Sequence, residues 1–314
     1  MTVGLCCVLR ITVWLKCVSQ TMARPWVIIT GASSGIGVSF CKIYAKRSYN
    51  IVLVARRRQL LDEQAQLLVA SHSGLETLVI DEDLGVAGGA ERLVDKIRAA
   101  GVVASALVNN AGTPVRGRLA AVEWATTASM LQLMVVTPAF LCREFLKDGL
   151  AQDRERTQPL HIINVSSIGA LVPTPKMGVY GPTKAFLVHL SETLAAEHSS
   201  DCVVVALCPG YVDTGIHEKV GMGHLVKQLP WFMWQESDEV AEEALQAVDS
   251  GSCVHVPGTI NRWTSHVLSW SIMRHTWTWM TSTRTTSVSW GSWFSSLVGG
   301  SSSDGKLPKQ QSKL

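Results

Sequence analysis

Two side chains that could exchange a proton lie four residues apart in the second half of the chain, Tyr180 and Lys184. On a helix this spacing puts both side chains on one face, so they can converge on one ligand. Pro182 between them is compatible with a helix only near its start, where a missing N–H costs nothing. A free tyrosine has a pKa of about 10, but a neighbouring ammonium group favours the phenolate. The pair therefore predicts acid or base chemistry near the first turn of a helix.

Two hydroxyl groups, Ser166 and Ser167, follow the apolar run from His161 to Val165. That run reads as a buried strand, so the serines would reach the same site from the opposite side. Taken singly, each residue has another explanation: the two serines fit a Ser-Ser turn, Tyr180 fits a half-buried tyrosine, and Lys184 fits a lysine on a helix surface.

An anion-binding turn is predicted from Thr30 to Gly37, which reads Thr-Gly-Ala-Ser-Ser-Gly-Ile-Gly directly after an apolar run. Gly31, Gly35 and Gly37 fall where a strand must turn sharply into a helix, and a residue without a Cβ lets the backbone approach a phosphate. The helix from Ile36 to about Arg47 would direct its free N–H groups and positive dipole end at that anion. We interpret this stretch as a dinucleotide site.

Two further stretches, Asn109-Asn110-Ala111-Gly112 and Tyr180-Gly181-Pro182-Thr183-Lys184, follow the turn along the chain. In order and spacing, the three motifs resemble those of the classical short-chain dehydrogenases/reductases over roughly Pro25 to Gly258. The resemblance implies an oxidoreductase in which Ser167, thirteen residues before Tyr180, hydrogen-bonds the substrate oxygen. Nicotinamide would deliver a hydride to carbon, Tyr180 would give the proton, and Lys184 would also hold the ribose hydroxyls.

The same resemblance assigns further positions to the cofactor. Asp83 would hold the adenine, Ala111 and Gly112 would keep the wall of the crevice thin, and Thr214 would contact the nicotinamide amide. The expected catalytic residues are Ser167, Tyr180 and Lys184. The expected cofactor-binding residues are Gly31, Ser33, Ser34, Gly35, Ile36, Gly37, Arg56, Asp83, Asn110, Ala111, Gly112, Tyr180, Lys184, Pro209, Gly210 and Thr214.

The residues after the second expected strand favour NADP as the cofactor. An enzyme that uses NAD places an acid there for the ribose 2′-hydroxyl, and one that uses NADP places a base for the 2′-phosphate. Ala55 stands in the acid's place and three arginines, Arg56 to Arg58, follow it. Guanidinium groups suit a phosphate dianion, and no carboxylate repels it. The alternative is an exposed helix start, where cations are unfavourable against the dipole, and this mismatch favours the phosphate role for Arg56.

One position departs from the family pattern. An Asn on the long helix between the fourth and fifth strands normally anchors a water in the proton relay, and alignment on Pro138 puts Met134 in its place. Gln132 is the one nearby amide in the sequence, and a thioether cannot relay a proton. Either Gln132 or another water path substitutes, or turnover is slow. The last case supports the rival hypothesis of a catalytically weak NADP-binding sensor. A membrane-surface scaffold protein is the other alternative.

The elements that would position these groups alternate between strand and helix. Seven short apolar runs are the expected strands: Val27–Thr30, Ile51–Ala55, Thr77–Ile80, Ala106–Val108, His161–Val165, Val203–Leu207 and Val254–Val256. Runs that are apolar on both faces indicate a parallel sheet covered on both sides. The segments Gln59–Ala70, Gly89–Ala100 and Phe186–His198 have helical periodicity. The pattern predicts a single α/β domain with a doubly wound (Rossmann), mostly parallel seven-stranded sheet and helices on both faces.

A substrate lid is expected from Gly215 to Gln235. Gly221 and Gly223 would serve as hinges, and apolar residues are frequent in the stretch. An apolar lid implies a small hydrophobic carbonyl or alcohol substrate, such as a long-chain 3-oxoacyl ester, a steroid or a retinoid. The same side chains would equally fit packing against the core.

Composition excludes several other classes. The formal charge of +3 over 314 residues is too small and too spread out for nucleic-acid binding. The eight cysteines include no Cys-x-x-Cys pair and no His at metal-ligand spacing, so we expect no metal. They suit reduced, buried thiols in a reducing compartment.

The ends of the chain are expected to lie outside the catalytic domain of residues 25–260. Residues 1–24 read as a targeting or anchor segment, or as a mispredicted start before Met22. Residues 261–298 form a Trp-rich helical segment that fits either a dimer seam or an interfacial membrane helix, and residues 299–314 form a disordered tail. We expect a cytoplasmic location with peripheral membrane contact, the endoplasmic reticulum and mitochondrion staying open as alternatives. The family resemblance implies a homo-oligomer.

Overall fold

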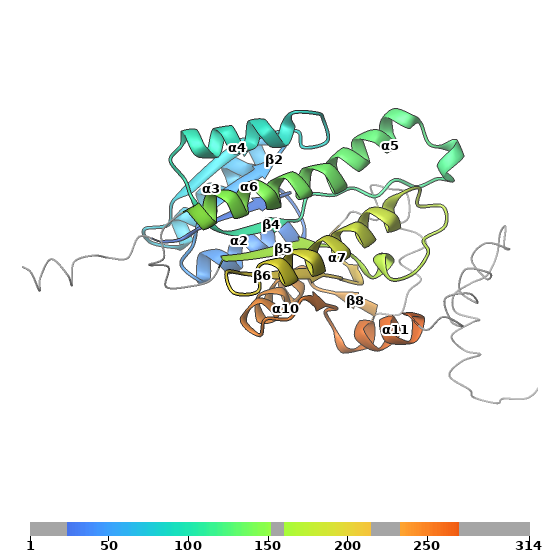
Figure 1. The fold of residues 1–314 in the computed structure, drawn as a ribbon. Coiled ribbons are helices and arrows are strands. Elements are labelled where there is room, and N and C mark those ends of the chain that lie inside the picture. The colour runs from blue at the N-terminus through green and yellow to red at the C-terminus, as the bar shows by residue number, and fades with distance from the viewer. Residues whose placement is uncertain (1–23, 152–159, 215–232, 270–314) are drawn as a thin grey trace, which may run out of the picture.

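The computed structural model describes residues 24–151, 160–214 and 233–269. Its centre is a seven-stranded parallel sheet in the order β3-β2-β1-β4-β5-β6-β9 (Figure 1). The strands are β1 (Trp26–Thr30), β2 (Asn50–Ala55), β3 (Thr77–Asp81), β4 (Ala104–Asn109), β5 (Leu160–Val165), β6 (Cys202–Leu207) and β9 (Val254–His255). The strand order reverses between β1 and β4, and ligands of doubly wound sheets bind at this reversal.

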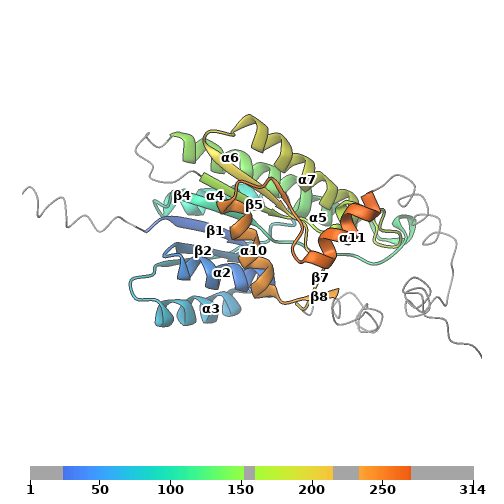
Figure 2. The same cartoon turned by 90° about the horizontal axis from the view of Figure 1, so that it is seen from below.

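Helices cover both faces of the sheet, as Figure 2 shows edge-on. One layer holds α2 (Ile36–Lys46), α3 (Arg58–Ser71) and α10 (Ser237–Asp249). The opposite layer holds α4 (Gly89–Ala99), α5 (Trp124–Leu131), α6 (Thr137–Ala151) and α7 (Tyr180–Glu197). Short elements at the ends of the strands are the 3₁₀ turns η1 (Leu119–Ala121) and η3 (Ile168–Ala170), the strands β7 (Tyr211–Val212) and β8 (Trp234–Gln235), and the helix α11 (Thr259–Ser269).

The buried strands explain the three layers. Val27 and Ile29 of β1 pack into the cluster with α2, whereas Ile28 between them packs into the cluster with α4 and α6. Successive side chains of a strand point to opposite faces, so a strand covered on both sides must be apolar throughout. This is why the continuous apolar runs predicted the sheet.

The predicted fold class is confirmed. Each of the seven expected strands is present, with bounds that differ by at most two residues from the expected ones. The helix expected from Phe186 begins six residues earlier, at Tyr180, because Pro182 occupies the third helical position, where it breaks no hydrogen bond.

A continuous helix runs from Trp124 to Ala151 and contains a π-helical turn, η2 (Gln132–Val136), between α5 and α6. Among the described residues it is the one helix long and apolar enough to cross a bilayer. Here it lies on the sheet, and its Leu141, Phe145 and Leu146 belong to the core. The extra residue of a π turn shifts which side chains face inward.

Several expectations concern residues outside the described ranges. These are the N-terminal extension up to residue 23, the lid from 215 to 232, the C-terminal segment beyond residue 269 and the disordered tail. Of the Trp-rich segment, the structure describes the first part as α11, where Trp263 is exposed.

Candidate active site

The predicted site residues follow the carboxyl ends of the strands, at the edge where the strand order reverses between β1 and β4. Asn109 at the end of β4 pairs with Asn164 of β5, so Asn110 and Ser166 leave the sheet at nearly the same level. The glycine-rich turn follows β1 at this edge, and the Pro209–Thr214 loop follows β6.

The glycine-rich turn has the geometry of a dinucleotide cradle. Gly31 and Gly35 have φ of 71° and 54°, which L side chains rarely adopt. A Cβ on Gly35 would lie 2.8 Å from Cβ of Thr214, and a Cβ on Gly37 would collide with the carbonyl of Gly31. No side chain caps the start of α2 and its first turn has no acidic residue, so its N–H groups stay available to an anion. These features fit a dinucleotide phosphate.

Asn110 holds this turn from behind. Its Nδ2 donates to the carbonyl of Thr30 over 2.9 Å, and the Thr30 hydroxyl accepts from the backbone N–H groups of Asn110 and Ala111 over 2.9 and 3.0 Å. The side-chain amide of Asn110, an expected cofactor residue, is therefore hydrogen-bonded to the protein itself. It contributes to the cradle by fixing the end of β1 rather than by offering its amide nitrogen to a ligand.

The arginine run divides into three different environments. Arg56 is largely exposed, and its Nη1 lies 4.0 Å from Oδ2 of Asp83, so these two expected cofactor residues are neighbours. Arg58 pairs with Asp62 and with Asp81 at the end of β3.

Arg57 is the member of the run that reaches the glycine-rich turn. Its Nη2 donates to Oγ of Ser33 over 3.0 Å. The sequence pattern pointed to Arg56, and the contact of Arg57 with Ser33 was not predicted. The signal was present in the run itself, but which of three consecutive side chains turns toward the loop depends on where the helix begins.

Ser167 and Tyr180 both lie close to Gly169. A Cβ placed on Gly169 would lie 3.5 Å from Oγ of Ser167 and 3.7 Å from Cε1 of Tyr180. Ser167 caps η3 by accepting from the N–H of Gly169 over 3.1 Å. Burial raises the pKa of Tyr180, and a hydrogen bond with Ser167 opposes the rise. The two hydroxyl groups can therefore act on a single oxygen atom.

Lys184 is buried behind the phenol. Its Nζ donates to the carbonyl of Val165 over 2.7 Å and lies 5.8 Å from the centroid of the Tyr180 ring. Burial lowers the pKa of Lys184 to about 8, against a smaller opposing effect of Cys208. The position of the ammonium favours the phenolate form of Tyr180.

Two buried hydrogen bonds set the register of α7 against β5. The Ser166 hydroxyl donates to the carbonyl of Lys184 over 2.7 Å, and Nδ2 of Asn164 donates to the hydroxyl of Ser191 over 2.9 Å. Because a buried polar group without a partner is costly, a slip of the helix by one residue is disfavoured. Ser166 therefore uses its hydroxyl to hold α7 against β5.

Met134 lies beside the ammonium group. It belongs to the π-helical turn and is 1% exposed. A Cβ on Gly112 would lie 3.8 Å from both Sδ and Cε of Met134 and 3.5 Å from Nζ of Lys184. An apolar thioether therefore occupies the wall next to Lys184.

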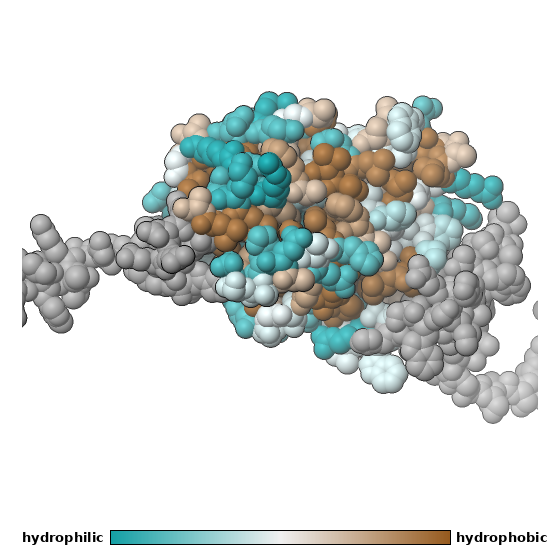
Figure 3. All heavy atoms as spheres, in the orientation of Figure 1, coloured by the Kyte–Doolittle hydropathy of each residue, from teal (hydrophilic) through white to brown (hydrophobic). Residues whose placement is uncertain are grey.

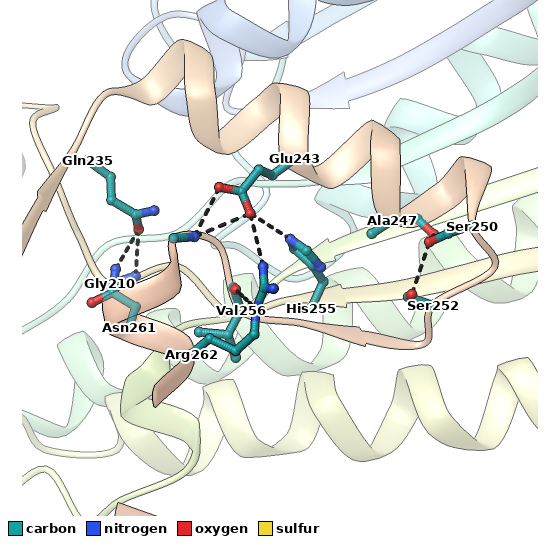
Figure 4. A network of polar contacts seen from close by, with 11 residues as sticks. Gly210, Gln235, Glu243, Ala247, Ser250, Ser252, His255, Val256, Asn261 and Arg262 are labelled. Atoms are coloured by element: carbon teal, nitrogen blue, oxygen red, sulfur yellow. Dashed lines mark hydrogen bonds and ion pairs between the residues drawn. The ribbon is translucent and has the colours of Figure 1, made fainter. Parts of the chain in front are cut away.

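Two amide side chains that the sequence analysis missed support the Pro209–Thr214 loop. Oε1 of Gln235 accepts from the N–H of Gly210 over 3.3 Å and from Nδ2 of Asn261 over 2.8 Å (Figure 4). Both side chains are buried. No sequence signal identifies them, because Gln235 ends the expected lid and Asn261 lies beyond the expected domain.

A metal centre has no support in the described part of the chain, where no three His, Cys, Asp or Glu side chains are grouped to hold an ion.

Comparison with known proteins matches the chain to one family. The family described as short chain dehydrogenase matches residues 25–224. A very-long-chain 3-oxoacyl-CoA reductase of Podospora anserina is 31% identical over 79% of this chain and 70% of its own length. The reductase of the same name from Anas platyrhynchos is 32% identical over 60% of each chain. The match thus spans less than two thirds of the duck relative.

A solved structure has the same architecture. The short-chain dehydrogenase from Sphingobium yanoikuyae in complex with NADPH aligns with a TM-score of 0.64 and 27% identity, over 84% of this chain and 98% of that one.

Proposed function

The chain belongs to the short chain dehydrogenase family, and on that basis we propose that it is an NADP-dependent oxidoreductase. It interconverts a carbonyl group and a secondary alcohol on a hydrophobic substrate. The observation that carries the proposal is the placement of Ser167 and Tyr180 on either side of Gly169, with the ammonium of Lys184 behind the phenol. These groups lie at the strand-order reversal that receives ligands in doubly wound sheets.

The chemistry divides between cofactor and protein. A bound NADPH supplies the hydride that reduces the carbonyl carbon. The protein holds the carbonyl oxygen between the hydroxyls of Ser167 and Tyr180, and Tyr180 donates its proton to that oxygen as negative charge develops. The buried ammonium of Lys184 stabilises the phenolate that remains until a proton from solvent restores it.

NADP is favoured over NAD by the arginine run. Ala55 leaves the end of β2 without a carboxylate. Arg56 lies beside Asp83, and Arg57 lies beside Ser33 of the glycine-rich turn. Guanidinium groups there can neutralise a 2′-phosphate. The Sphingobium structure, which contains NADPH, has the same fold.

A long-chain 3-oxoacyl thioester is the substrate class favoured by the names of the two relatives. Steroids and retinoids belong in the same panel, because the expected lid is apolar.

The test is NADPH oxidation with this panel by the native chain and by Tyr180→Phe. We expect the variant to lose at least about a hundredfold in kcat, the usual size of a general-acid contribution. Equal rates in the two proteins would overturn the proposal. Binding of NADPH, followed by tryptophan quenching, should survive the substitution and serves as the control for folding.

The alternative function is a catalytically weak NADP-binding sensor, and Met134 is the observation that favours it. Met134→Asn would place an amide beside Lys184, where the thioether now lies. If the native chain binds NADPH but turns over slowly and Met134→Asn raises kcat several-fold, the sensor is the better description.

The proposed setting is cytoplasmic with peripheral membrane contact and a homo-oligomeric state. Figure 3 shows apolar side chains gathered on the face formed by α5, α6 and α7. Val136 is half exposed there, and Phe140 and Leu190 are only partly buried. A second copy of the chain covering this face would remove these side chains from water.

A further inference from the structure

The side chain of Gln235 lies where three parts of the chain meet. It is 8% exposed, and its Oε1 receives one N–H from Gly210 and one from Asn261, which is 5% exposed. Figure 4 shows this amide pair beside the carboxylate of Glu243. One oxygen thus joins the loop after β6 to the first turn of α11.

The backbone is packed closely against both amides. A Cβ on Gly210 would lie 2.5 Å from Nδ2 of Asn261, and a Cβ on Gly258 would lie 2.7 Å from Nε2 of Gln235. Gly258 also has φ of 76°. Glycine at these two positions lets the amides touch the main chain, so a shift of either amide moves the loop.

The backbone of Gln235 also contacts the Pro209–Thr214 loop. Strands β7 and β8 pair in parallel, with Tyr211 opposite Trp234 and Val212 opposite Gln235. The N–H of Asp213 donates to the carbonyl of Gln235 over 3.2 Å. Residues 210–213 are therefore held by both the side chain and the main chain of one residue.

The loop in turn reaches the cofactor cradle. Thr214, the next residue, packs against Gly35 so closely that a Cβ there would overlap it. A continuous set of contacts therefore runs from Asn261 through Gln235 and Gly210 to the glycine-rich turn.

The segment around Asn261, at the start of α11, is held to α10 by Glu243. Glu243 accepts from the N–H of Gly258 over 3.0 Å, from Nε2 of His255 over 3.0 Å and from Nη2 of Arg262 over 3.4 Å. These bonds hold the start of α11 to a helix that itself packs on the core. The amide pair thus rests on a rigid support.

We propose that Gln235 and Asn261 are positioning residues that hold the Pro209–Thr214 loop against the glycine-rich turn and thereby couple the start of α11 to cofactor binding. This inference rests on the proposed function for its consequence in cofactor affinity. The positioning itself is a property of the protein alone. Neither residue touches the reacting atoms.

The test compares Gln235→Met and Asn261→Ala with a matched control, Asn50→Ala. Asn50 is also a buried amide, and its Oδ1 accepts one backbone N–H, that of Glu76, over 2.9 Å. It lies at the start of β2, at the opposite edge of the sheet. Gln235→Met keeps the length of the side chain but leaves two donors without an acceptor. Gln235→Glu keeps an acceptor oxygen at the same place.

Two readouts are taken, the Kd for NADPH and the amide hydrogen exchange of residues 210–214 without cofactor. We expect Gln235→Met to raise both the Kd and the exchange rate about tenfold, the order expected when a buried N–H loses its acceptor. Asn261→Ala removes the second donor to Oε1 of Gln235 and should raise both quantities as well. Asn50→Ala should lower Tm without changing either quantity. Gln235→Glu should lie closer to the native chain than Gln235→Met does.

Unchanged Kd and exchange in Gln235→Met and Asn261→Ala would overturn the inference. So would equal changes in the Asn50→Ala control, because the effect would then be general destabilisation. Failure of the proposed function gives a different result. If the native chain neither binds NADPH nor turns over substrate, the proposed function fails, and the amide exchange of residues 210–214 alone decides the positioning role.

Discussion

At the scale of single residues, the site places a lysine where it reduces stability. The Nζ of Lys184 is buried with a backbone carbonyl as its hydrogen-bond acceptor, and Met134 and Gly112 lie beside it. A buried ammonium without a carboxylate is costly, and its pKa falls accordingly to about 8. Such a cost is typical of a group retained for chemistry, and in the proposed mechanism the ammonium stabilises the phenolate of Tyr180.

The lowered pKa of Lys184 predicts how the stability of the folded protein depends on pH. The folded-state pKa of Lys184, about 8, lies below the ordinary value of 10.5. Between these two values the unfolded chain binds more protons, so the stability of the native chain rises as pH increases through this window. Lys184→Met lacks this gain, so its Tm relative to the native chain should fall as the pH rises from about 8 to about 10.5.

Differential scanning fluorimetry across this range measures the difference in Tm. Lys42→Met is the control, because Lys42 is half exposed and pairs with Asp238 at the surface. A difference that is independent of pH for Lys184→Met would contradict the prediction.

At the scale of elements, the site depends on where helices begin. Gly35 ends the glycine-rich turn one residue before α2, and Arg57 stands immediately before α3. Because α3 begins at Arg58, the side chains of Arg56 and Arg57 lie in the non-helical approach, close to Asp83 and Ser33. In the other helical layer, the π-helical turn η2 directs the side chain of Met134 toward Gly112.

Arg56→Asp is expected to shift the ratio of the NADH and NADPH dissociation constants toward NADH by about tenfold or more. A carboxylate there repels the 2′-phosphate and can accept from the ribose 2′-hydroxyl. Tryptophan-quenching titrations with both dinucleotides give the ratio.

Arg58→Asp changes the charge equally and is the matched control, since Arg58 is engaged with Asp62 and Asp81. An equal shift in both variants would mean that net charge, not a specific contact of Arg56, decides the preference.

At the scale of the whole molecule, the sheet separates the chemistry from the supporting core. The proposed catalytic groups follow the carboxyl end of β5 and lie at the start of α7, while packed aromatic residues lie at the amino end of β5. There Tyr44 stacks on His161, and its hydroxyl lies 2.8 Å from Nε2 of that ring. The helical layer of α5, α6 and α7 supplies Lys184 inward and an apolar face outward.

Val136→Glu is expected to convert the proposed homo-oligomer to monomers, because it replaces a half-exposed apolar side chain of the α5–α6 helix with a charge. Analytical ultracentrifugation measures the mass in solution. Leu67→Glu on α3 is the control, since Leu67 is more exposed than Val136 and lies on the opposite layer. An oligomer that survives Val136→Glu would show that copies meet elsewhere.

The amino-acid sequence by itself determined the parts of this protein that depend on local spacing. Apolar runs predicted each strand of the seven-stranded sheet, Pro182 indicated the start of α7, and the glycine spacing predicted the turn after β1. The four-residue spacing of Tyr180 and Lys184 placed them on one helical face. Local backbone geometry is decided within a few residues, so a pattern in the sequence can show it.

Only the tertiary structure decided contacts between residues far apart in the chain. Gln235 meets Gly210 and Asn261, 25 and 26 residues away, and Arg57 reaches Ser33 across 24 residues. These contacts depend on the packing of the sheet, the helices and the loops, which sets the distance between elements to within an ångström. A buried amide can satisfy its hydrogen bonds in many ways, and the fold selects one of them because every other arrangement leaves a donor without an acceptor.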